Sequence, residues 1–291
     1  MRSMTDRPLV LDFDGSVGTL PGACVIALGD WHQRIRFGCT MRTFSQLRRD
    51  VALQLPDAHG PVFTGSGDFH HTSLMMIERL AHRGPMDVVV LDNHPDNMRF
   101  PWGIHCGSWV SHVVRLPFVR QVHVMGITSS DVAWNHALEN RLAALWRGRL
   151  SYWCVGVHTR WADRVGLGRA VRSFDSIQSM LEVFAQQQRD SRTPIYLSID
   201  KDVMSPLVVR TNWDQGRMDE RELMQAIALV RPRLIGSDVT GDVSVARYES
   251  RWKRWLSALD AQPEFGAAEL AQWQSAQRQL NNTLLQALAL H

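Results

Sequence analysis

Three polar residues near position 94 have the types and the spacing of metal ligands. Asp92, His94 and Asp96 stand at alternate positions directly after the apolar run 86–91. Alternate residues of an extended chain point to the same side, so these side chains can converge. Carboxylate oxygens together with an imidazole suit Mn²⁺ and similar divalent ions better than metals that prefer thiolates. Taken alone, the cluster is explained equally well as a cap on the following helix.

A second carboxylate pair strengthens the metal hypothesis. Asp200 and Asp202 follow the apolar run 195–199. Two carboxylates at i and i+2 face the same side and repel each other unless a cation lies between them. Lys201 is a weak candidate for that cation, because the same alternation turns its side chain to the opposite side. A bound metal ion is therefore the better counter-ion.

A glycine-rich turn supplies a third set of candidate ligands. The segment 65–71 ends in the pair His70 and His71, at the start of a predicted helix. A histidine pair on its own is more often a helix cap or a surface feature. Each of the three clusters, however, follows a strand-like run, and open α/β sheets bind ligands beyond the carboxyl ends of their strands. Together the clusters predict a metal centre.

Short β-rich runs alternate along the chain with longer helical patterns. The predicted strands are residues 9–13, 24–28, 86–91, 122–125, 152–157, 195–199 and 234–237, several of them continuously apolar, as in parallel strands covered on both faces. The predicted helices are residues 44–55, 72–82, 133–146, 176–188, 220–230 and 267–290. This alternation predicts a mostly parallel sheet with helices on both faces. No repeat or low-complexity linker divides the sequence, so we expect one domain over residues 1–291.

The three clusters resemble the metal-site motifs of the ureohydrolase superfamily, which comprises arginase, agmatinase and formiminoglutamase. The family motifs G-G-D-H, D-A-H-x-D and S-x-D-x-D-x-x-D-P correspond to Gly-Asp-Phe-His at 67–70, Asp-Asn-His-Pro-Asp at 92–96 and Ser-Ile-Asp-Lys-Asp-Val-Met-Ser-Pro at 198–206. Their order and wide spacing also agree, and the resemblance spans residues 60–245. It implies an arginase-like fold, a single-domain, three-layer α/β/α sandwich.

The resemblance also implies two divalent metal ions per chain, most readily Mn²⁺. A hydroxide shared between metals about 3.5–4 Å apart would be the nucleophile. The implied ligands are two bridging carboxylates and two further pairs, namely Asp96 and Asp200 as bridges, His70 with Asp92 at one ion, and His94 with Asp202 at the other. The first motif carries one extra residue, so His71 is an alternative to His70.

A short segment after the second motif supplies a candidate proton donor. Gly-Ile-His-Cys-Gly at 103–107 resembles the family segment G-N-x-H-G, whose histidine is a proposed proton shuttle. The resemblance makes His105 the candidate general acid for the leaving amine, beside Asp96 as the second candidate catalytic residue. Because the matching segment is short, a partly buried structural histidine is the alternative.

Two positions depart from the family motifs. Ser205 replaces the last aspartate of the third motif, a position that is not usually a metal ligand. Gly241 stands where guanidine-cleaving members carry a glutamate that clamps the guanidinium, and Asp242 could replace it only with a bulged backbone. Without that carboxylate, a guanidinium loses its charge-assisted planar partner. Guanidinium substrates are therefore in doubt.

The segment 210–216 takes the place of a family loop near the mouth of the site. Arg210 could hold a substrate carboxylate, and Trp213 could form a wall of the pocket. Arg210, Asn212 and Asp242 are the candidate substrate-binding residues. An ordinary surface turn explains the segment equally well.

These residues predict a binuclear metal hydrolase that cleaves a C–N bond, other than a peptide bond, in a small amidine, guanidine-like or amide substrate. Two alternatives stay open. One is a single-metal amide hydrolase similar to the related deacetylases, which the pair His70 and His71 also fits. The other is a non-catalytic member with a binding role, which Ser205 and Gly241 favour.

A different activity is suggested by Asp-Phe-Asp-Gly-Ser at 12–16, which resembles the motif of haloacid-dehalogenase-type phosphatases. Such a phosphatase would use the first aspartate as nucleophile and could use Lys201 with its flanking carboxylates. It would leave Asp92, His94 and Asp96 without a role. A glycine turn at the end of the first strand is the better explanation.

Composition limits the classes of partner. The net charge is +3, and the arginines spread along the sequence instead of forming the concentrated basic face of nucleic-acid binders. The four scattered cysteines indicate buried, reduced thiols. No run approaches the roughly 20 apolar residues of a membrane span, and the N-terminus lacks the apolar core of a secretory signal. We expect a cytoplasmic enzyme with a small-molecule substrate, no nucleic-acid or membrane partner and, by resemblance, a homo-oligomeric state. The segment 251–255 carries two tryptophans and is either an interface or a helix with packed indoles.

Overall fold

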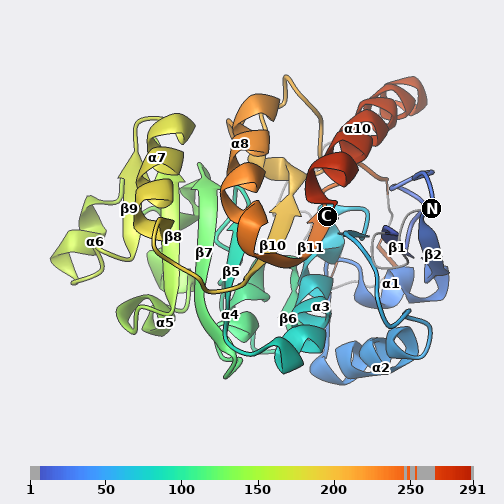
Figure 1. Cartoon of the computed structure of the whole chain (residues 1–291), viewed down its shortest axis with the longest axis horizontal. Coiled ribbons are helices and arrows are strands. Elements are labelled where there is room, and N and C mark those ends of the chain that lie inside the picture. Colours follow the sequence, from blue (N-terminus) through green and yellow to red (C-terminus); the bar gives the residue numbers. More distant parts are fainter. Residues whose placement is uncertain (1–6, 246–247, 250–252, 254–265, 290–291) are drawn as a thin grey trace.

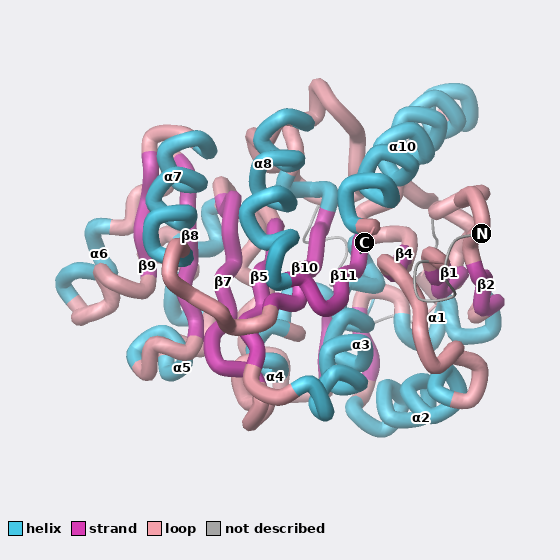
Figure 2. Tube along the Cα trace, in the orientation of Figure 1, coloured by secondary structure: helices cyan, strands magenta, loops and turns pink. Residues whose placement is uncertain are grey.

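The computed structural model describes residues 7–245, 248–249, 253 and 266–289 of the chain. Nine strands form one sheet in the order β2-β1-β4-β11-β10-β5-β7-β8-β9, and each neighbouring pair is parallel (Figures 1 and 2). The strands are β1 (Leu9–Asp12), β2 (Cys24–Ala27), β4 (Val62–Phe63), β5 (Met86–Leu91), β7 (Val119–Ile127), β8 (Leu150–Val155), β9 (Val171–Phe174), β10 (Ile195–Asp200) and β11 (Leu234–Thr240). A separate antiparallel pair joins β3 (Gly38–Cys39) and β6 (Ile104–His105).

Helices cover both faces of the sheet. They are α1 (His32–Ile35), α2 (Met41–Ala52), α3 (Ser73–Arg79), α4 (Val110–Val113), α5 (Ala143–Trp146), α6 (Arg160–Arg164), α7 (Ile177–Gln188), α8 (Glu220–Val230) and α10 (Ala267–Leu288). Short 3₁₀ helices used below are η3 (Gly67–Thr72), η7 (Ala137–Glu139) and η8 (Lys201–Val203). Figure 1 shows α7, α8 and α10 in a row along the sheet.

The core is split in two by the sheet, as the alternation of strand side chains requires. Val88 and Val90 of β5 belong to the core under α2, α3 and α4, whereas Val89 and Leu91 belong to the core under α7, α8 and α10. Every residue of β5, β8 and β10 is buried, in keeping with the continuously apolar runs. The predicted three-layer α/β/α sandwich with a mostly parallel sheet is confirmed.

The strand register brings the three candidate clusters to one edge of the sheet. Leu91, Ile199, Val239 and Phe63 lie side by side across β5, β10, β11 and β4. The chain leaves each strand at this level, so the segments after them start as neighbours although they lie far apart in the sequence. This edge therefore carries the candidate site.

The helix predicted over 133–146 is wrong. The structure has only the single turns η7 and α5 there, because the backbone of this segment pairs with the loop that follows Asp96. The Arg99 N–H donates to Glu139 O at 2.8 Å, and the Arg141 N–H donates to Asn97 O at 3.0 Å. These tertiary hydrogen bonds replace the i to i−4 bonds that a helix would need.

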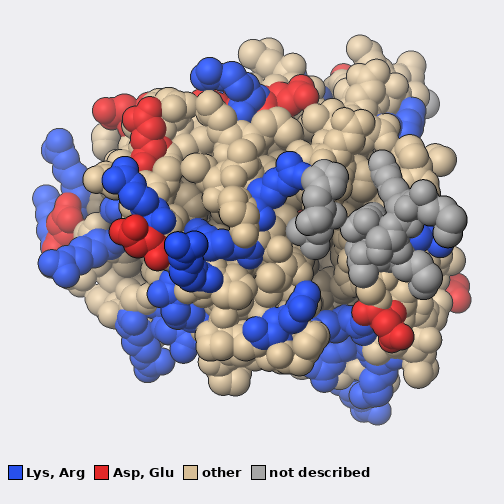
Figure 3. Space-filling view, in the orientation of Figure 1, with Lys and Arg blue, Asp and Glu red and all other residues tan. Residues whose placement is uncertain are grey.

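No helix in the described part of the chain is both long and apolar enough to cross a membrane. On the face in Figure 3, lysine and arginine side chains stand in several separate groups with acidic residues between some of them. The expectation that no nucleic acid binds stays a prediction. The tryptophans of 251–255, Trp252 and Trp255, lie outside the described residues.

We expect the start of α8 to depend on Asp219. Its Oδ1 accepts from the Glu222 N–H at 2.7 Å, and Glu222 Oε2 accepts from the Asp219 N–H at 2.9 Å, which is a capping box. Asp219→Ala should lower the free energy of unfolding by about 1 kcal/mol in urea denaturation. Asp219→Ser keeps a capping oxygen and should lose clearly less, and equal losses in the two variants would contradict this role.

Candidate metal centre

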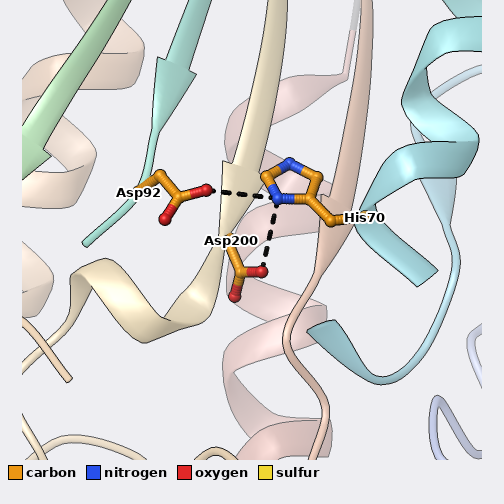
Figure 4. Close-up of side chains that lie close together, drawn as sticks. All are labelled: His70, Asp92 and Asp200. Carbon is orange, nitrogen blue, oxygen red and sulfur yellow. Dashed lines mark ion pairs between the residues drawn. The ribbon is translucent and has the colours of Figure 1, made fainter. Parts of the chain in front are cut away.

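His70 faces three carboxylates at the carboxyl edge of the sheet. It lies in η3, the turn that follows β4. The Ser66 side chain caps the start of η3 by accepting from the Asp68 N–H. Its Nδ1 is 3.2 Å from Asp92 Oδ2, 3.1 Å from Asp96 Oδ2 and 3.4 Å from Asp200 Oδ2. Figure 4 shows Asp92 at the end of β5 and Asp200 at the end of β10, both directed at the same nitrogen of the His70 ring.

The other ring nitrogen of His70 defines the tautomer. Ser198 donates its hydroxyl proton to Asp238 Oδ1 at 2.7 Å, and its oxygen lies 2.9 Å from His70 Nε2. Because the Ser198 proton is already used, Nε2 must be the donor in that contact. A neutral His70 then presents the Nδ1 lone pair to three carboxylate oxygens. Such an arrangement of ligand atoms fits a divalent cation. Ser198 is then the hydrogen-bond partner that orients the ring, a partner that metal-binding histidines usually have.

A second group of ligand atoms adjoins the first. His94 Nδ1 lies 2.9 Å from Asp202 Oδ2 and 3.6 Å from Asp92 Oδ1. The ligand atoms of His70, Asp92 and Asp200 lie within 4.8 Å of one another, and so do those of Asp92, His94 and Asp202. Asp92 belongs to both groups, whereas of the two carboxylates expected as bridges Asp200 belongs to the first group only and Asp96 to neither.

Asp96 reaches the centre from a constrained backbone. Its φ is +46°, a left-handed conformation that aspartate adopts more readily than most residues. Its Oδ2 accepts a hydrogen bond from Trp109 Nε1 at 2.6 Å, which directs the carboxylate toward His70. Asp96 thus lies beside the first group.

Crowding of buried carboxylates perturbs their protonation. Burial, with the charge of Asp92, raises the pKa of Asp96 to about 7. Burial raises the pKa of Asp200 to about 6 and that of Asp202 well above its ordinary value. Without a metal, protons therefore neutralise charge that a cation would otherwise balance.

The two histidines respond in the opposite sense. Burial lowers the pKa of His70, but Asp92 and Asp96 raise it further, so it lies well above the ordinary value. Asp202 does the same for His94. His71 is directed elsewhere, with its ring 6.1 Å from that of Phe44, and burial lowers its pKa well below the ordinary value. The structure thus brings His70, and not His71, to the carboxylates.

His105 lies near the centre but outside both ligand groups. Its Nδ1 accepts from the Gly107 N–H at 3.0 Å, and its ring stacks on Phe37 with 5.7 Å between centroids. Burial, with the charge of His112, lowers its pKa to about 4, so the side chain is neutral at pH 7. The Gly107 contact places the remaining proton on Nε2.

The three candidate substrate-binding residues are placed differently. Arg210 is exposed, with its guanidinium 5.9 Å from the Trp273 ring. Asn212 is buried, and both ends of its amide bond to the backbone of Ser244, at 2.7 and 2.8 Å. Asp242 is fully buried in an ion pair with Lys201 at 2.6 Å. These contacts give Asn212 and Asp242 structural partners within the protein.

Trp213 lies beside the ligands. Its ring centroid is 6.3 Å from that of His94, and a Cβ at Gly67 would lie 3.0 Å from both its Cδ1 and Asp200 Oδ2. The side chain of His94 is 18% exposed, whereas those of the other five candidate ligands are at most 7% exposed. Solvent therefore reaches the centre on the side that His94 and Trp213 line.

Sequence reasoning missed the supporting residues. Ser198 belongs to the third motif, but the motif does not indicate that its hydroxyl contacts His70 or that Asp238 accepts its proton. Asp238 is fully buried and also accepts from Ser73 and Tyr196. A lone aspartate inside an apolar strand was the available signal, because a buried carboxylate needs donors.

A family model agrees with this geometry. The model of the arginase family matches residues 12–241. The chain belongs to the arginase family. An uncharacterized protein from Thermotoga maritima is 25% identical over 189 residues, which are 65% of this chain and 60% of the relative's own length. The resemblance to ureohydrolases is thereby confirmed.

Solved structures of the family share the fold. This chain is similar to a putative agmatinase from Clostridium difficile, with a TM-score of 0.56, 12% identity and coverage of 97% of this chain and 96% of the other. It is also similar to a formimidoylglutamase from Bacillus subtilis, with a TM-score of 0.52, 14% identity and coverage of 97% of this chain and 87% of the other. A proclavaminate amidino hydrolase from Streptomyces clavuligerus matches with a TM-score of 0.51, 17% identity and coverage of 86% of this chain and 71% of the other. At these identities the likeness concerns the fold.

We expect Mn²⁺ to stabilise the protein through Asp92. A ligand at a hundred times its Kd adds about 2.7 kcal/mol of stability, so Mn²⁺ should raise the melting temperature of the chelator-treated protein. Asp92→Asn should abolish this shift, because the residue is common to both ligand groups. The exposed Asp190→Asn is the matched control and should keep the full shift. An Asp92→Asn variant that Mn²⁺ stabilises normally would contradict the assignment.

In the metal-free protein, the contribution of the metal-centre residues to stability should fall as pH rises from about 4 to 7. The raised pKa values of Asp96, about 7, and Asp200, about 6, mean that the folded state binds more protons than the unfolded state in that window. Raised pKa values of His70 and His94 act in the same sense above pH 6.5. Mn²⁺ must displace these protons, so its binding should strengthen about tenfold per pH unit for each proton released. Melting curves at pH 5 to 8 with and without Mn²⁺ measure this, and a pH-independent shift would be the contrary result.

Proposed function

We propose that this protein is a metal-dependent hydrolase that cleaves a C–N bond, other than a peptide bond, in a small substrate. The proposal includes two divalent ions, most readily Mn²⁺, held by His70, Asp92, His94, Asp96, Asp200 and Asp202. The observation that carries it is the sharing of Asp92 between two adjoining ligand groups. A single group would suit one ion, whereas two groups with a common carboxylate suit a pair.

The metal ions, when bound, would supply Lewis acidity and lower the pKa of water in the site. The protein residues would supply orientation. Ser198 and Asp238 hold the His70 ring, and Trp109 holds the Asp96 carboxylate, each through a hydrogen bond. Because the side chains of His70 and Asp96 are already held by these hydrogen bonds, they would lose little conformational freedom when metal ions bind, and the geometry of the ligands would stay fixed.

His105 is proposed to serve the leaving amine. The Gly107 N–H occupies Nδ1, so the neutral ring can donate a hydrogen bond from Nε2–H to the leaving group, and it can transfer a proton only after Nδ1 is protonated and the Gly107 contact breaks. Phe37 and Phe100 hold the ring, at centroid distances of 5.7 and 4.4 Å. A positioned proton donor contributes typically 10²–10⁴-fold to the rate.

Gly241 directs the proposal toward neutral substrates. Its φ is +92°, and a Cβ there would collide with Asp200 Oδ1. A glutamate could not occupy this position without moving a candidate ligand. The neighbouring Asp242 is committed to Lys201. With neither carboxylate free to clamp a planar cation, we favour an amide over guanidines and amidines, which are protonated at pH 7, and we place it against the rings of Trp213 and Phe37.

The deciding experiment combines metal content with turnover. Protein purified with Mn²⁺ and then dialysed should hold about two manganese ions per chain by elemental analysis. It should release ammonia or amine from members of a panel of small amides, and less from amidines and guanidines of the same size. One zinc ion per chain would favour the deacetylase-like alternative. Two ions without turnover on any compound would favour a binding role.

A His105→Asn variant ties the turnover to the site. It should keep its manganese, since His105 lies outside both ligand groups, and lose about a hundredfold in kcat on the responsive substrate. Unchanged kcat would remove His105 from the mechanism and leave the metal assignment intact. Asp190→Asn again serves as the surface control.

A further inference from the structure

The C-terminal helix α10 contacts residues that adjoin the candidate ligands, although it lies beyond the stretch that the family model matches. That match ends at residue 241, and α10 covers Ala267–Leu288. Gln277 and Asn281 stand one turn apart on the helix, and both are fully buried although polar. In Figure 1 the helix ends beside β11, at the sheet. Buried amides of this kind need specific partners.

Asn281 completes a closed set of contacts around Lys201. Lys201 Nζ donates to Asp242 Oδ1 at 2.6 Å and to Asn281 Oδ1 at 2.9 Å. Asn281 Nδ2 in turn donates to the same Asp242 oxygen at 3.0 Å. All three side chains are fully or almost fully buried. The amide thus accepts from the cation and donates to the anion, so it bridges the ion pair.

This triangle touches two of the segments that supply candidate ligands. Lys201 stands between Asp200 and Asp202 in the sequence. The Asp242 N–H donates to Gly65 O at 2.9 Å, at the start of the turn that delivers His70. A displacement of the triangle would therefore be passed to both segments.

Gln277 secures the neighbouring loop. Its Nε2 donates to Gly241 O at 3.1 Å and to Arg210 O at 2.6 Å. Gly241 is packed closely against the side chain of Asp200 and the backbone of Lys201, where no Cβ fits. The helix therefore holds Gly241, which packs against the Asp200 side chain, through Gln277, and it holds the ammonium of Lys201 through Asn281.

We propose that α10 is part of the metal centre and that Asn281 is a positioning residue for Asp200 and Asp202. A buried ammonium that lacks acceptors is costly, and a broken buried ion-pair network seeks other partners. If Asn281 no longer bridges the pair, Lys201 Nζ keeps only Asp242, whose second carboxylate oxygen has no other hydrogen-bond partner, so the ammonium shifts toward that oxygen. This shift moves the backbone of Lys201, and with it the flanking carboxylates of Asp200 and Asp202 that would hold the metal. The inference rests on the proposed metal-dependent function.

The test is Mn²⁺ binding by the full-length chain with Asn281→Leu, a change that keeps the branched shape of the side chain and removes both hydrogen-bonding groups. Free Mn²⁺ is followed by electron paramagnetic resonance, and the spectrum of the bound ions is recorded at low temperature. We expect affinity about tenfold weaker than that of the wild type and an altered bound-ion spectrum, in line with the 10–100-fold cost of losing a second-layer partner. If the Asn281→Leu variant does not fold, the same measurements are made on Asn281→Ser.

Leu288→Ala is the matched control on the same helix. Leu288 is fully buried and two turns away from Asn281, so its truncation should lower the melting temperature while leaving Mn²⁺ affinity within twofold of the wild type. If Asn281→Leu behaves like Leu288→Ala, α10 is only a structural element and the inference is overturned. A wild type that binds no Mn²⁺, Co²⁺ or Zn²⁺ overturns the proposed function, and this inference with it.

Discussion

Negative charge buried at the carboxyl edge of the sheet is the constraint on which the rest of the structure depends. Four aspartates and two histidines converge there with little or no contact with solvent, and burial together with neighbouring carboxylates raises the pKa values of Asp96, Asp200 and Asp202. Like charges at such short range are tolerated in a protein interior only when protons or cations balance them. The parallel strands, the turns after them and the covering helices all serve to hold this cluster together.

Two buried cations flank the centre, and each is already engaged. Arg36 lies 2.6 Å from Asp68 and 3.0 Å from Asp14, behind the turn that carries His70. Lys201 is held by Asp242 and Asn281. Neither guanidinium nor ammonium is directed at the ligand carboxylates. The protein thus uses its own positive charges to fix the frame and leaves the negative charge of the centre for a bound ion.

The surroundings of the centre differ from its polar interior. Trp213 stacks on Phe37 with 6.0 Å between centroids, and Phe37 stacks in turn on His105. The loop of Trp213 is anchored next to the ligands, because the Gly216 N–H donates to Asp202 O at 2.6 Å. Rigid aromatic walls beside a buried charge favour a planar substrate group and exclude bulk water, which strengthens electrostatic interactions inside the site.

The sequence by itself determined a mostly parallel sheet, apart from the short strands β4 and β9, its two covering layers and the three clusters of candidate ligands, because apolar runs that end in alternating carboxylates report local geometry directly. It did not determine the missing helix over 133–146, the choice between His70 and His71, the shared position of Asp92 or the role of α10. Those features depend on hydrogen bonds and charges between segments that are far apart in the chain, such as Arg141 with Asn97 and Lys201 with Asn281. Periodicity carries no information about such contacts, and only the tertiary structure brings the partners together.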